Sequence, residues 1–287
     1  MTDLGAILTA MVTPFDAAGR VDEEAAVALM HHLVGHGSDG LVVCGTTGES
    51  ATLSDEEHLR VIELAVRELG GRHTVVAGAG SNDTRHAVHL TERATELGAD
   101  AILSVTPYYN RPNRRGLVGH YEAVARATDR PILLYNIPNR TGLNMGPDLL
   151  AELAQIDGIV GLKQANDDEL AMIDGLPLLY AGNDTTLGRT LALGGAGGIL
   201  VASHLVGEEM RRMVDEPERR AEIEAGLAEV YEALAFAPAA VAVKAALSLL
   251  GHPGGHVRLP YADADEGEIA ALRAMLERRG LLQTAAT

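Results

Sequence analysis

Residues 74–105, TVVAGAGSNDTRHAVHLTERATELGADAILSV, contain the structural unit that repeats along this chain. The stretch begins and ends with apolar runs, at 74–77 and 101–105, whose length and composition are typical of buried strands. Between them Leu90, Ala94 and Leu97 are spaced four and three residues apart, which is the period of a helix with one apolar face. Strands that are apolar on both faces and joined by helices are typical of parallel sheets, so we expect a strand, a covering helix and a parallel strand.

Similar apolar runs recur along the chain, with segments of helical period between them. Eight runs are predicted strands, at 7–12, 41–44, 74–77, 101–105, 131–137, 159–162, 178–181 and 199–202. Eight such units match an α/β fold of the (β/α)8 or TIM-barrel type, which takes about 250 residues.

The alternative fold is an open, doubly wound sheet. Gly78 and Gly80 would begin a dinucleotide fingerprint only if a third glycine followed at position 83, where Asp83 stands. The glycine cluster at 194–198 precedes a strand, so we place it at the end of the sheet away from a phosphate site. Both observations favour the barrel.

Beyond residue 205 the pattern is helical, with helices predicted near 217–236, 238–250 and 266–279. We therefore expect a catalytic barrel over residues 1–222 and a C-terminal helical region over 223–287. His252 and His256 lie four residues apart in the loop between two of these helices, but Pro253 and two glycines separate them. We expect no metal site there.

The composition limits the function classes. The 287 residues include 40 acidic and 23 basic side chains, and the net charge of −17 argues against a nucleic-acid interface. With 47% hydrophobic residues the chain can bury one large core or two small ones. The single cysteine, Cys44, forms no intramolecular disulfide and fits a reducing compartment.

Neither a signal peptide nor a membrane span is expected. The first residues lack a basic segment before the apolar run. The longest apolar stretch, 233–250, contains Pro238 and Lys244 and is shorter than the about 20 residues that a span requires. We therefore expect a cytoplasmic protein without membrane contact.

Of the 23 basic residues only Lys163 and Lys244 are lysines. Arginine can replace lysine as a surface charge but cannot form a Schiff base, which suggests that one of the two is kept for its amine. Lys163 follows the apolar run 159–162, where desolvation would lower the pKa of the amine and make it nucleophilic. The alternative is a lysine that reaches the rim or pairs with a carboxylate. For Lys244, on an apolar helix, we expect a structural ion pair.

In a parallel barrel the functional side chains lie where strands end, and several polar motifs follow the predicted strands. They are GTTGE at 45–49, TPYYN at 106–110 and YNIPNRTG at 135–142. Tyr135 ends the strand that precedes the one with Lys163, so its phenol could transfer protons to groups bonded to that amine. The alternative for Tyr135 is a core tyrosine with a satisfied hydroxyl.

The other motif residues suggest anion binding. Thr46 and Thr47 offer hydroxyls and backbone N–H groups to a carboxylate, or else they form a capping turn before the helix that starts near Ser54. Arg140 could hold a second carboxylate with two hydrogen bonds, or else it is a surface arginine. Tyr108 and Tyr109 fit an aromatic contact between subunits.

Four motifs together carry a family resemblance. GTTGES at 45–50, TPYYN at 106–110, YNIPNRTG at 135–142 and GLK at 161–163 occur in order and at family spacing. The chain thereby resembles the dihydrodipicolinate synthases, which are pyruvate-dependent class I aldolases of the N-acetylneuraminate lyase superfamily and (β/α)8 barrels. The resemblance runs from about residue 5 to residue 250 and is weaker in the C-terminal helices.

The resemblance implies a Schiff-base mechanism without a cofactor. Lys163 would form an imine with the ketone of pyruvate, whose carboxylate Thr46 and Thr47 would hold. Loss of a proton would give an enamine that attacks the aldehyde of L-aspartate 4-semialdehyde. The amine of that substrate would then close the ring and displace Lys163. The product would be 4-hydroxy-tetrahydrodipicolinate, an intermediate of lysine and diaminopimelate biosynthesis.

The resemblance also assigns roles to further residues. Tyr135, Thr46 and Tyr109 would relay protons, with Tyr109 contributed by a neighbouring subunit of a homotetramer. Arg140 would bind the semialdehyde carboxylate. The Ile199 carbonyl would lie near the lysine amine, and Gly182 would lie near the pyruvate.

Arg140 favours the synthases over relatives that cleave sialic acid or deoxy sugar acids, which typically lack this arginine. Two other functions remain open: a lyase for a 2-keto-3-deoxy sugar acid or a related pyruvate aldolase, and a non-catalytic paralogue that binds a keto acid. The chain departs from the synthase pattern at Asn183-Asp184 and at Ala237-Pro238.

Feedback inhibition by lysine is the least supported family property. Asn82, His58 and Tyr108 match the family's allosteric pocket between subunits, but Asp55 and His86 stand where inhibited members usually have a histidine and a glutamate. Without that glutamate an anion that pairs with the ammonium of the effector is missing, so we expect weak or absent inhibition.

Overall fold

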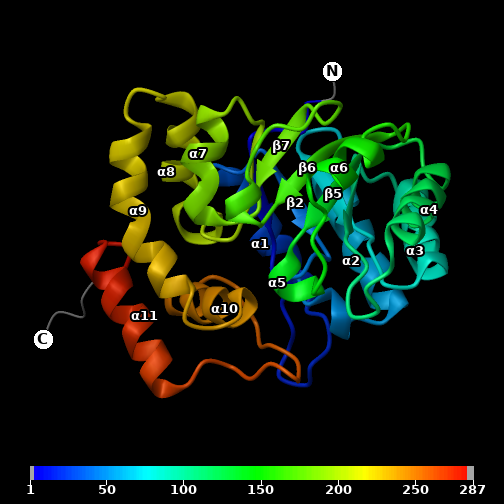
Figure 1. The fold of residues 1–287 in the computed structure, drawn as a ribbon. Coiled ribbons are helices and arrows are strands. Elements are labelled where there is room, and N and C mark those ends of the chain that lie inside the picture. Colours follow the sequence, from blue (N-terminus) through cyan, green and yellow to red (C-terminus); the bar gives the residue numbers. More distant parts are fainter. Residues whose placement is uncertain (1–2, 283–287) are drawn as a thin grey trace, which may run out of the picture.

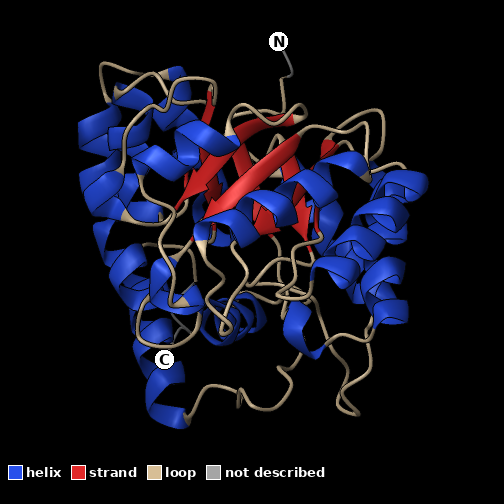
Figure 2. Cartoon of the chain, turned by 45° about the vertical axis from the view of Figure 1, so that its right-hand side comes forward, coloured by secondary structure: helices blue, strands red, loops and turns tan. Residues whose placement is uncertain are grey.

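Eight parallel strands close into a barrel in the computed structural model, which describes residues 3–282 (Figures 1 and 2). The strands are β1 (Ile7–Ala10), β2 (Gly40–Val43), β3 (Thr74–Gly78), β4 (Ala101–Val105), β5 (Ile132–Asn136), β6 (Ile159–Gln164), β7 (Leu178–Ala181) and β8 (Gly197–Leu200). Each pairs with its neighbour in sequence, and β1 also pairs with β8 to close the barrel. The predicted TIM barrel is thus confirmed, and the doubly wound alternative is excluded.

Helices surround the strands, as Figure 2 shows. Those of the barrel are α1 (Glu23–Gly35), α2 (Asp55–Leu69), α3 (Thr84–Leu97), α4 (Arg114–Arg126), α5 (Pro138–Thr141), α6 (Pro147–Leu153), α7 (Leu187–Ala192) and α8 (Ser203–Asp215), with short 3-10 turns at η1 (Ser50–Thr52), η2 (Asp167–Glu169) and η3 (Asp184–Thr186). Helix α2 begins at a capping box in which Ser54 and Glu57 bond to each other's backbone N–H groups. Helix α3 ends at Gly98 with φ 95°, a left-handed cap that suits glycine.

The core has two layers because successive strand side chains point to opposite faces. The layer between strands and helices is built largely of leucine, valine, isoleucine and alanine. The layer inside the barrel contains Leu8, Ala10, Val42, Val76, Ala101, Leu103, Leu133, Tyr135, Ala165, Leu178, Tyr180 and Ile199. Lys163 lies in β6, two residues before the inward Ala165, so it shares this inner face.

Six of the eight strands differ at one or both ends from the predicted runs, and only β4 and β7 match them. Three of these differences bear on the site or on the closure of the barrel. Strand β6 runs to Gln164, so Lys163 lies within the strand and not just beyond it. Strand β2 ends at Val43 because the next residue, Cys44, turns to φ 55°. Strand β8 starts at Gly197, so part of the glycine cluster lies inside the sheet. A Cβ at Gly197 would come within 1.9 Å of the Ala6 carbonyl oxygen, and the β1–β8 closure therefore needs glycine there.

Three further helices follow the barrel: α9 (Arg220–Leu234), α10 (Ala239–Leu249) and α11 (Glu266–Arg278). Figure 1 shows α10 lying across one end of the barrel, with α11 and the connecting loop beside it. Helix α9 runs across residue 222, and residues 283–287 lie outside the described residues, so the division into 1–222 and 223–287 stays a prediction.

Within residues 3–282 no single helix is long and apolar enough to cross a membrane. Helices α9 and α10 pass that length and composition test only as a pair, and they are bent by 106° at the break between them.

Candidate active site

A cavity of about 120 Å³ lies at the carboxyl ends of the strands. It is lined by Thr46, Thr47, Tyr135, Ile137, Arg140, Lys163, Gly182, Asn183, Val201, Ala239, Ala240 and Tyr261. The structure thus brings together six of the predicted site residues from four strand ends: both threonines, Tyr135, Arg140, Lys163 and Gly182.

Lys163 lines this cavity from strand β6 and is buried. In the register of the sheet it is paired with Tyr135 on β5 and Tyr180 on β7, and its Nζ lies 4.3 Å from the centroid of the Tyr135 ring. Burial lowers the pKa of the amine from 10.5 to about 7, although the Asp184 carboxylate acts in the opposite direction. A large fraction of the amine is therefore neutral near pH 7, which is the state that attacks a carbonyl carbon.

Tyr135 supplies a protonated phenol beside this amine. Burial raises the pKa of the phenol to about 12, while the charge of Arg140 and a hydrogen bond with Thr46 act in the opposite direction. The phenol therefore keeps its proton at neutral pH. It can donate this proton to a reacting group only if a neighbouring group supplies another proton in its place. Thr46 is such a group, and the pair can act as a short proton relay.

The loop after β2 holds Thr46 and Thr47 in place. Gly48 is close-packed: a Cβ there would lie 3.1 Å from the Met11 carbonyl oxygen, and the Thr13 hydroxyl donates to the Gly48 carbonyl at 2.8 Å. The cap of helix α2 is Ser54, so the threonines are not required as caps.

A buried ion pair also fixes this loop to helix α10. The carboxylate of Glu49, which adopts φ 54°, lies 2.5 Å from the Lys244 amine, and both side chains are almost fully buried. Lys244 therefore forms the structural ion pair that we expected of it.

Arg140 and Gly182 border the cavity after the ends of β5 and β7, the two strands that flank β6. Arg140 is exposed on the short helix α5, and its charge acts on the pKa values of both Lys163 and Tyr135. The segment around α5 is tied to the barrel through Asn136, whose side chain donates to Gln164 at 3.0 Å and Asn144 at 2.8 Å. At Gly182 a Cβ would come within 2.7 Å of the Gln164 carbonyl oxygen, so the close approach of β6 requires glycine.

Two predicted residues lie elsewhere. Ile199 packs inside the barrel but does not line the cavity. Tyr109 is 89% exposed, adopts φ 72° and also does not line it. Its neighbour Tyr108 lines a second cavity of about 290 Å³, which shares Thr46 and Arg140 with the first.

The predicted effector residues lie apart from Lys163, around the start of α3. His58 is buried and its Nε2 lies 2.7 Å from the Gly78 carbonyl oxygen, while the Asn82 carbonyl accepts a bond from Asn110. His86 and Asp55 pair with each other at 2.9 Å. The Asp55 carboxylate is thus present here, but it already pairs with His86.

Asp184 is a functional candidate that the sequence reasoning passed over. Its buried carboxylate accepts hydrogen bonds from the backbone N–H groups of Val201 and Ala202 at 2.9 and 3.0 Å, and its charge raises the pKa of Lys163. Burial raises the pKa of Asp184 itself. The signal was available, because Asn183-Asp184 follows the seventh predicted strand as the other motifs follow theirs.

Tyr261 also lines the cavity without having been predicted. It follows the last barrel strand by some sixty positions, in a loop whose sequence carries no motif, so the sequence contains no signal that places it there.

The two loop histidines do not converge on a common point. His252 stacks on His32 with ring centroids 3.8 Å apart, whereas His256 bonds to Asp263 at 2.8 Å. In the described part of the chain no three histidine, cysteine or acidic side chains are grouped so as to hold a metal ion.

Comparison with known proteins agrees with this geometry. A model of the dihydrodipicolinate synthetase family matches residues 3–279. The chain belongs to this family. A curated family member from Thermosynechococcus vestitus, named 4-hydroxy-tetrahydrodipicolinate synthase, is 42% identical over 99% of this chain and all of the relative.

Solved structures of the family superpose closely. The synthase from Cyanidioschyzon merolae with lysine bound is 40% identical, with a TM-score of 0.93 over 97% of this chain and 99% of that one. The chloride-inhibited synthase from Acinetobacter baumannii complexed with pyruvate is 34% identical, with a TM-score of 0.93 over 97% of this chain and all of that one.

Proposed function

We propose that this chain is the lyase that condenses pyruvate with L-aspartate 4-semialdehyde to give 4-hydroxy-tetrahydrodipicolinate, in lysine and diaminopimelate biosynthesis. The observation that carries the proposal is the buried Lys163 amine, whose pKa is lowered to about 7 in a cavity shared with Tyr135, Thr46, Thr47 and Arg140. The names of the curated relatives, which are 42% identical or close to it over nearly the whole chain, support the choice of reaction.

The reaction starts at the neutral amine of Lys163, which attacks the ketone carbon of pyruvate. The resulting carbinolamine loses water and becomes an imine. Loss of a proton from the pyruvate methyl group gives an enamine, and its carbon bonds to the aldehyde carbon, whose oxygen becomes a hydroxyl. The amine of the second substrate then attacks the imine carbon, closes the ring and releases Lys163.

The remaining residues hold and protonate these species. Thr46 and Thr47 bind the pyruvate carboxylate through hydroxyls and backbone N–H groups at the end of β2. Tyr135, Thr46 and Tyr109 move the protons, and Arg140 binds the semialdehyde carboxylate with its guanidinium. Gly182 and the Ile199 carbonyl border the pyruvate and the lysine amine.

Tyr109 requires a second subunit in this scheme. Its side chain is 89% exposed and held at a positive φ, which suits a residue that inserts into a neighbouring protein surface. We infer a homotetramer in the cytoplasm in which Tyr109 completes the proton relay of the adjoining site. Sedimentation velocity tests the assembly, and an active monomer would contradict it.

Borohydride trapping tests the function directly. Incubation with pyruvate and borohydride should fix a pyruvyl group on Lys163, and peptide mass mapping distinguishes it from Lys244, which serves as the internal control. Addition of aspartate semialdehyde should then consume the adduct before it is trapped. An adduct that persists would leave a pyruvate aldolase or lyase of another substrate, such as a 2-keto-3-deoxy sugar acid. Absence of an adduct on Lys163 would leave a non-catalytic keto-acid-binding protein.

A further inference from the structure

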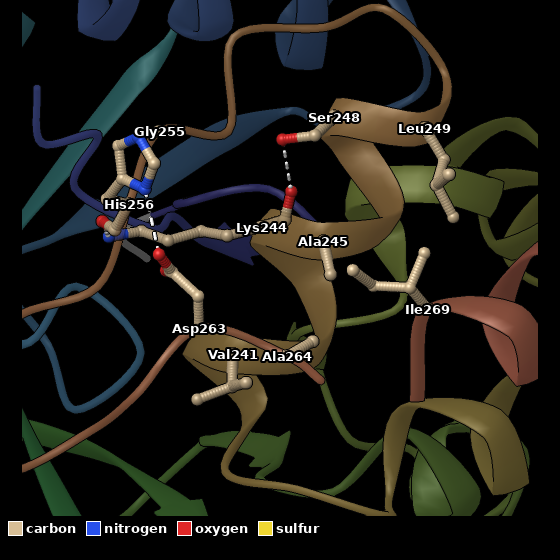
Figure 3. A pocket seen from close by; sticks show the side chains of 10 residues that line it. All are labelled: Val241, Lys244, Ala245, Ser248, Leu249, Gly255, His256, Asp263, Ala264 and Ile269. Carbon is tan, nitrogen blue, oxygen red and sulfur yellow. Dashed lines mark hydrogen bonds and ion pairs between the residues drawn. The ribbon is translucent and has the colours of Figure 1, made fainter. Parts of the chain in front are cut away.

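The loop at 256–263 is a closed structural unit that lies over the mouth of the barrel. The Asp263 carboxylate joins its two ends, with Oδ2 2.8 Å from His256 Nδ1 and Oδ1 accepting from the Val257 N–H at 3.0 Å. Figure 3 shows Asp263 and His256 facing each other beside helix α10. The backbone of His256 donates to the Phe15 carbonyl at 2.9 Å, so the base of the loop is attached to the segment after β1.

Arg258 anchors this loop to the barrel. Its guanidinium pairs with Glu57 at 2.5 Å and donates to the carbonyls of Thr52 and Gly19, both at 2.7 Å, while its backbone N–H donates to Glu49 at 3.0 Å. The same guanidinium lies 4.1 Å from the Phe15 ring centroid. A planar guanidinium with partners on three sides fixes its loop more firmly than a single ion pair does.

The buried ion pair between Glu49 and Lys244 strengthens the attachment of the 256–263 loop to the barrel. The Lys244 amine bonds both to Glu49 and to the His256 carbonyl, the latter at 2.6 Å. Glu49 therefore connects the loop after β2, which carries Thr46 and Thr47, to helix α10 and to the 256–263 loop. A displacement of the 256–263 loop would therefore break its hydrogen bonds with Glu49 and Lys244, which hold the loop that carries Thr46 and Thr47.

Tyr261 is the residue that this anchored loop presents to the site. Its backbone N–H donates to the Arg258 carbonyl at 3.0 Å, so a turn sets its position relative to the anchor. Its half-buried side chain lines both the Lys163 cavity and the larger neighbouring cavity. The residues common to the two cavities are Thr46, Ile137, Arg140 and Tyr261. Tyr261 thus stands at the junction, together with the proposed binder of the second carboxylate.

We propose that Tyr261 contacts the acceptor aldehyde and sets its affinity. This inference rests on the proposed function. Pyruvate becomes bonded to Lys163 at the inner end, between the strand residues, so the aldehyde must occupy the junction on the outer side. There Tyr261 offers an apolar ring and a hydroxyl donor, and Arg140, which lines the same two cavities, supplies a positive charge.

The test compares Tyr261→Ala with Leu259→Ala. Leu259 lies in the same loop, is 84% exposed and lines neither cavity, so its variant controls for general changes in the loop. Tyr261→Ala should raise the KM for the semialdehyde about tenfold, with the KM for pyruvate and the borohydride-trapped fraction within about twofold of wild type. Leu259→Ala should leave all three unchanged.

Two results would overturn the inference: unchanged kinetics for both substrates, or an equal rise in both KM values. If Tyr261→Ala does not fold, Tyr261→Phe removes only the hydroxyl and should raise the KM for the semialdehyde about threefold. In that case an unchanged KM for Tyr261→Phe overturns the inference. Wild-type protein that traps pyruvate but does not consume the semialdehyde would instead contradict the proposed function, so the two failures are distinguishable.

Discussion

Lys163 derives its reactivity from its surroundings, and two nearby charges oppose each other in setting its pKa. Burial lowers that pKa to about 7, Asp184 raises it and Arg140 lowers it further. Because only the neutral amine attacks pyruvate, the rate of imine formation should rise with pH through about 7 and then level off. The rate is measured by quenching with borohydride after short incubations across the pH range.

The Asp184→Asn variant tests whether the Asp184 charge raises the pKa of Lys163. The amide can still accept the backbone N–H groups of Val201 and Ala202, but the negative charge that stabilises the ammonium form is gone. The midpoint of the pH profile should therefore move to lower pH. A midpoint that stays in place or moves upward would contradict the role of Asp184.

Tyr135 should affect proton transfer more than imine trapping. Tyr135→Phe removes the hydroxyl that bonds with Thr46, and we expect a kcat lower by about 10²–10³-fold, with an adduct on Lys163 that still forms with time. Tyr180→Phe is the matched control, because Tyr180 is also paired in register with Lys163 but donates its hydroxyl to the Gly5 carbonyl. Comparable losses of kcat in both variants would indicate a packing effect.

At this scale the sequence locates residues whose type is rare or whose motif follows a strand. Lys163 stands out because the chain has only two lysines, and Tyr135 because it ends a predicted strand. The same rule, applied to the seventh predicted strand at 178–181, selects Asp184. Tyr261 could not be found, since its place depends on the contacts of Arg258 with the loops after β1 and β2.

The buried pair between the loop after β2 and helix α10 has a measurable stability effect. Glu49→Gln would leave the Lys244 charge buried without its partner, which costs about 3–5 kcal/mol in the free energy of unfolding. Glu63→Gln removes an exposed partner of Arg60 and should cost about 1 kcal/mol or less. Urea unfolding of the two variants compares them, and equal losses would show that the buried pair contributes no more than a surface pair.

Strands and helices were predictable from apolar periodicity, whereas several of their ends were not. The apolar pattern predicts strand β8 over 199–202, because Gly197 and Gly198 have low strand propensity. They belong to the strand since Gly197 must lie against Ala6, a contact between opposite ends of the barrel sequence. Cys44 ends β2 by a left-handed turn that non-glycine residues rarely adopt, so its position could not be predicted from the residue type.

For the whole molecule, eight repeated units predicted the closed barrel, and the strand order confirms it. The C-terminal helices were predicted as helices, but not as part of the site. Of these, helix α10 and the following loop belong to it, because Ala239, Ala240 and Tyr261 line the Lys163 cavity. Figure 1 shows α10 lying across one end of the barrel.

Regulation by an effector also concerns the whole molecule, because the family resemblance places the predicted effector pocket between subunits. His86 is paired with Asp55 and offers no carboxylate to an incoming ammonium group. We expect initial rates to be unaffected by micromolar L-lysine, although the synthase from Cyanidioschyzon merolae was solved with lysine bound. His86→Glu restores the anion and should gain sensitivity, and inhibition of the wild type by micromolar lysine would refute the prediction.

Chemical labelling of Cys44 can measure local unfolding at the end of β2. It is the single cysteine in the sequence, and the residue is buried. Its thiol donates to the His58 carbonyl, and burial raises the pKa of the thiol. A thiol-modifying reagent can therefore react only when the end of β2 separates from α2. The labelling rate, divided by the rate for the unfolded chain, gives the equilibrium constant for local opening at the loop that carries Thr46 and Thr47. Pyruvate bound at this loop should slow the labelling in proportion to the fraction of sites it occupies.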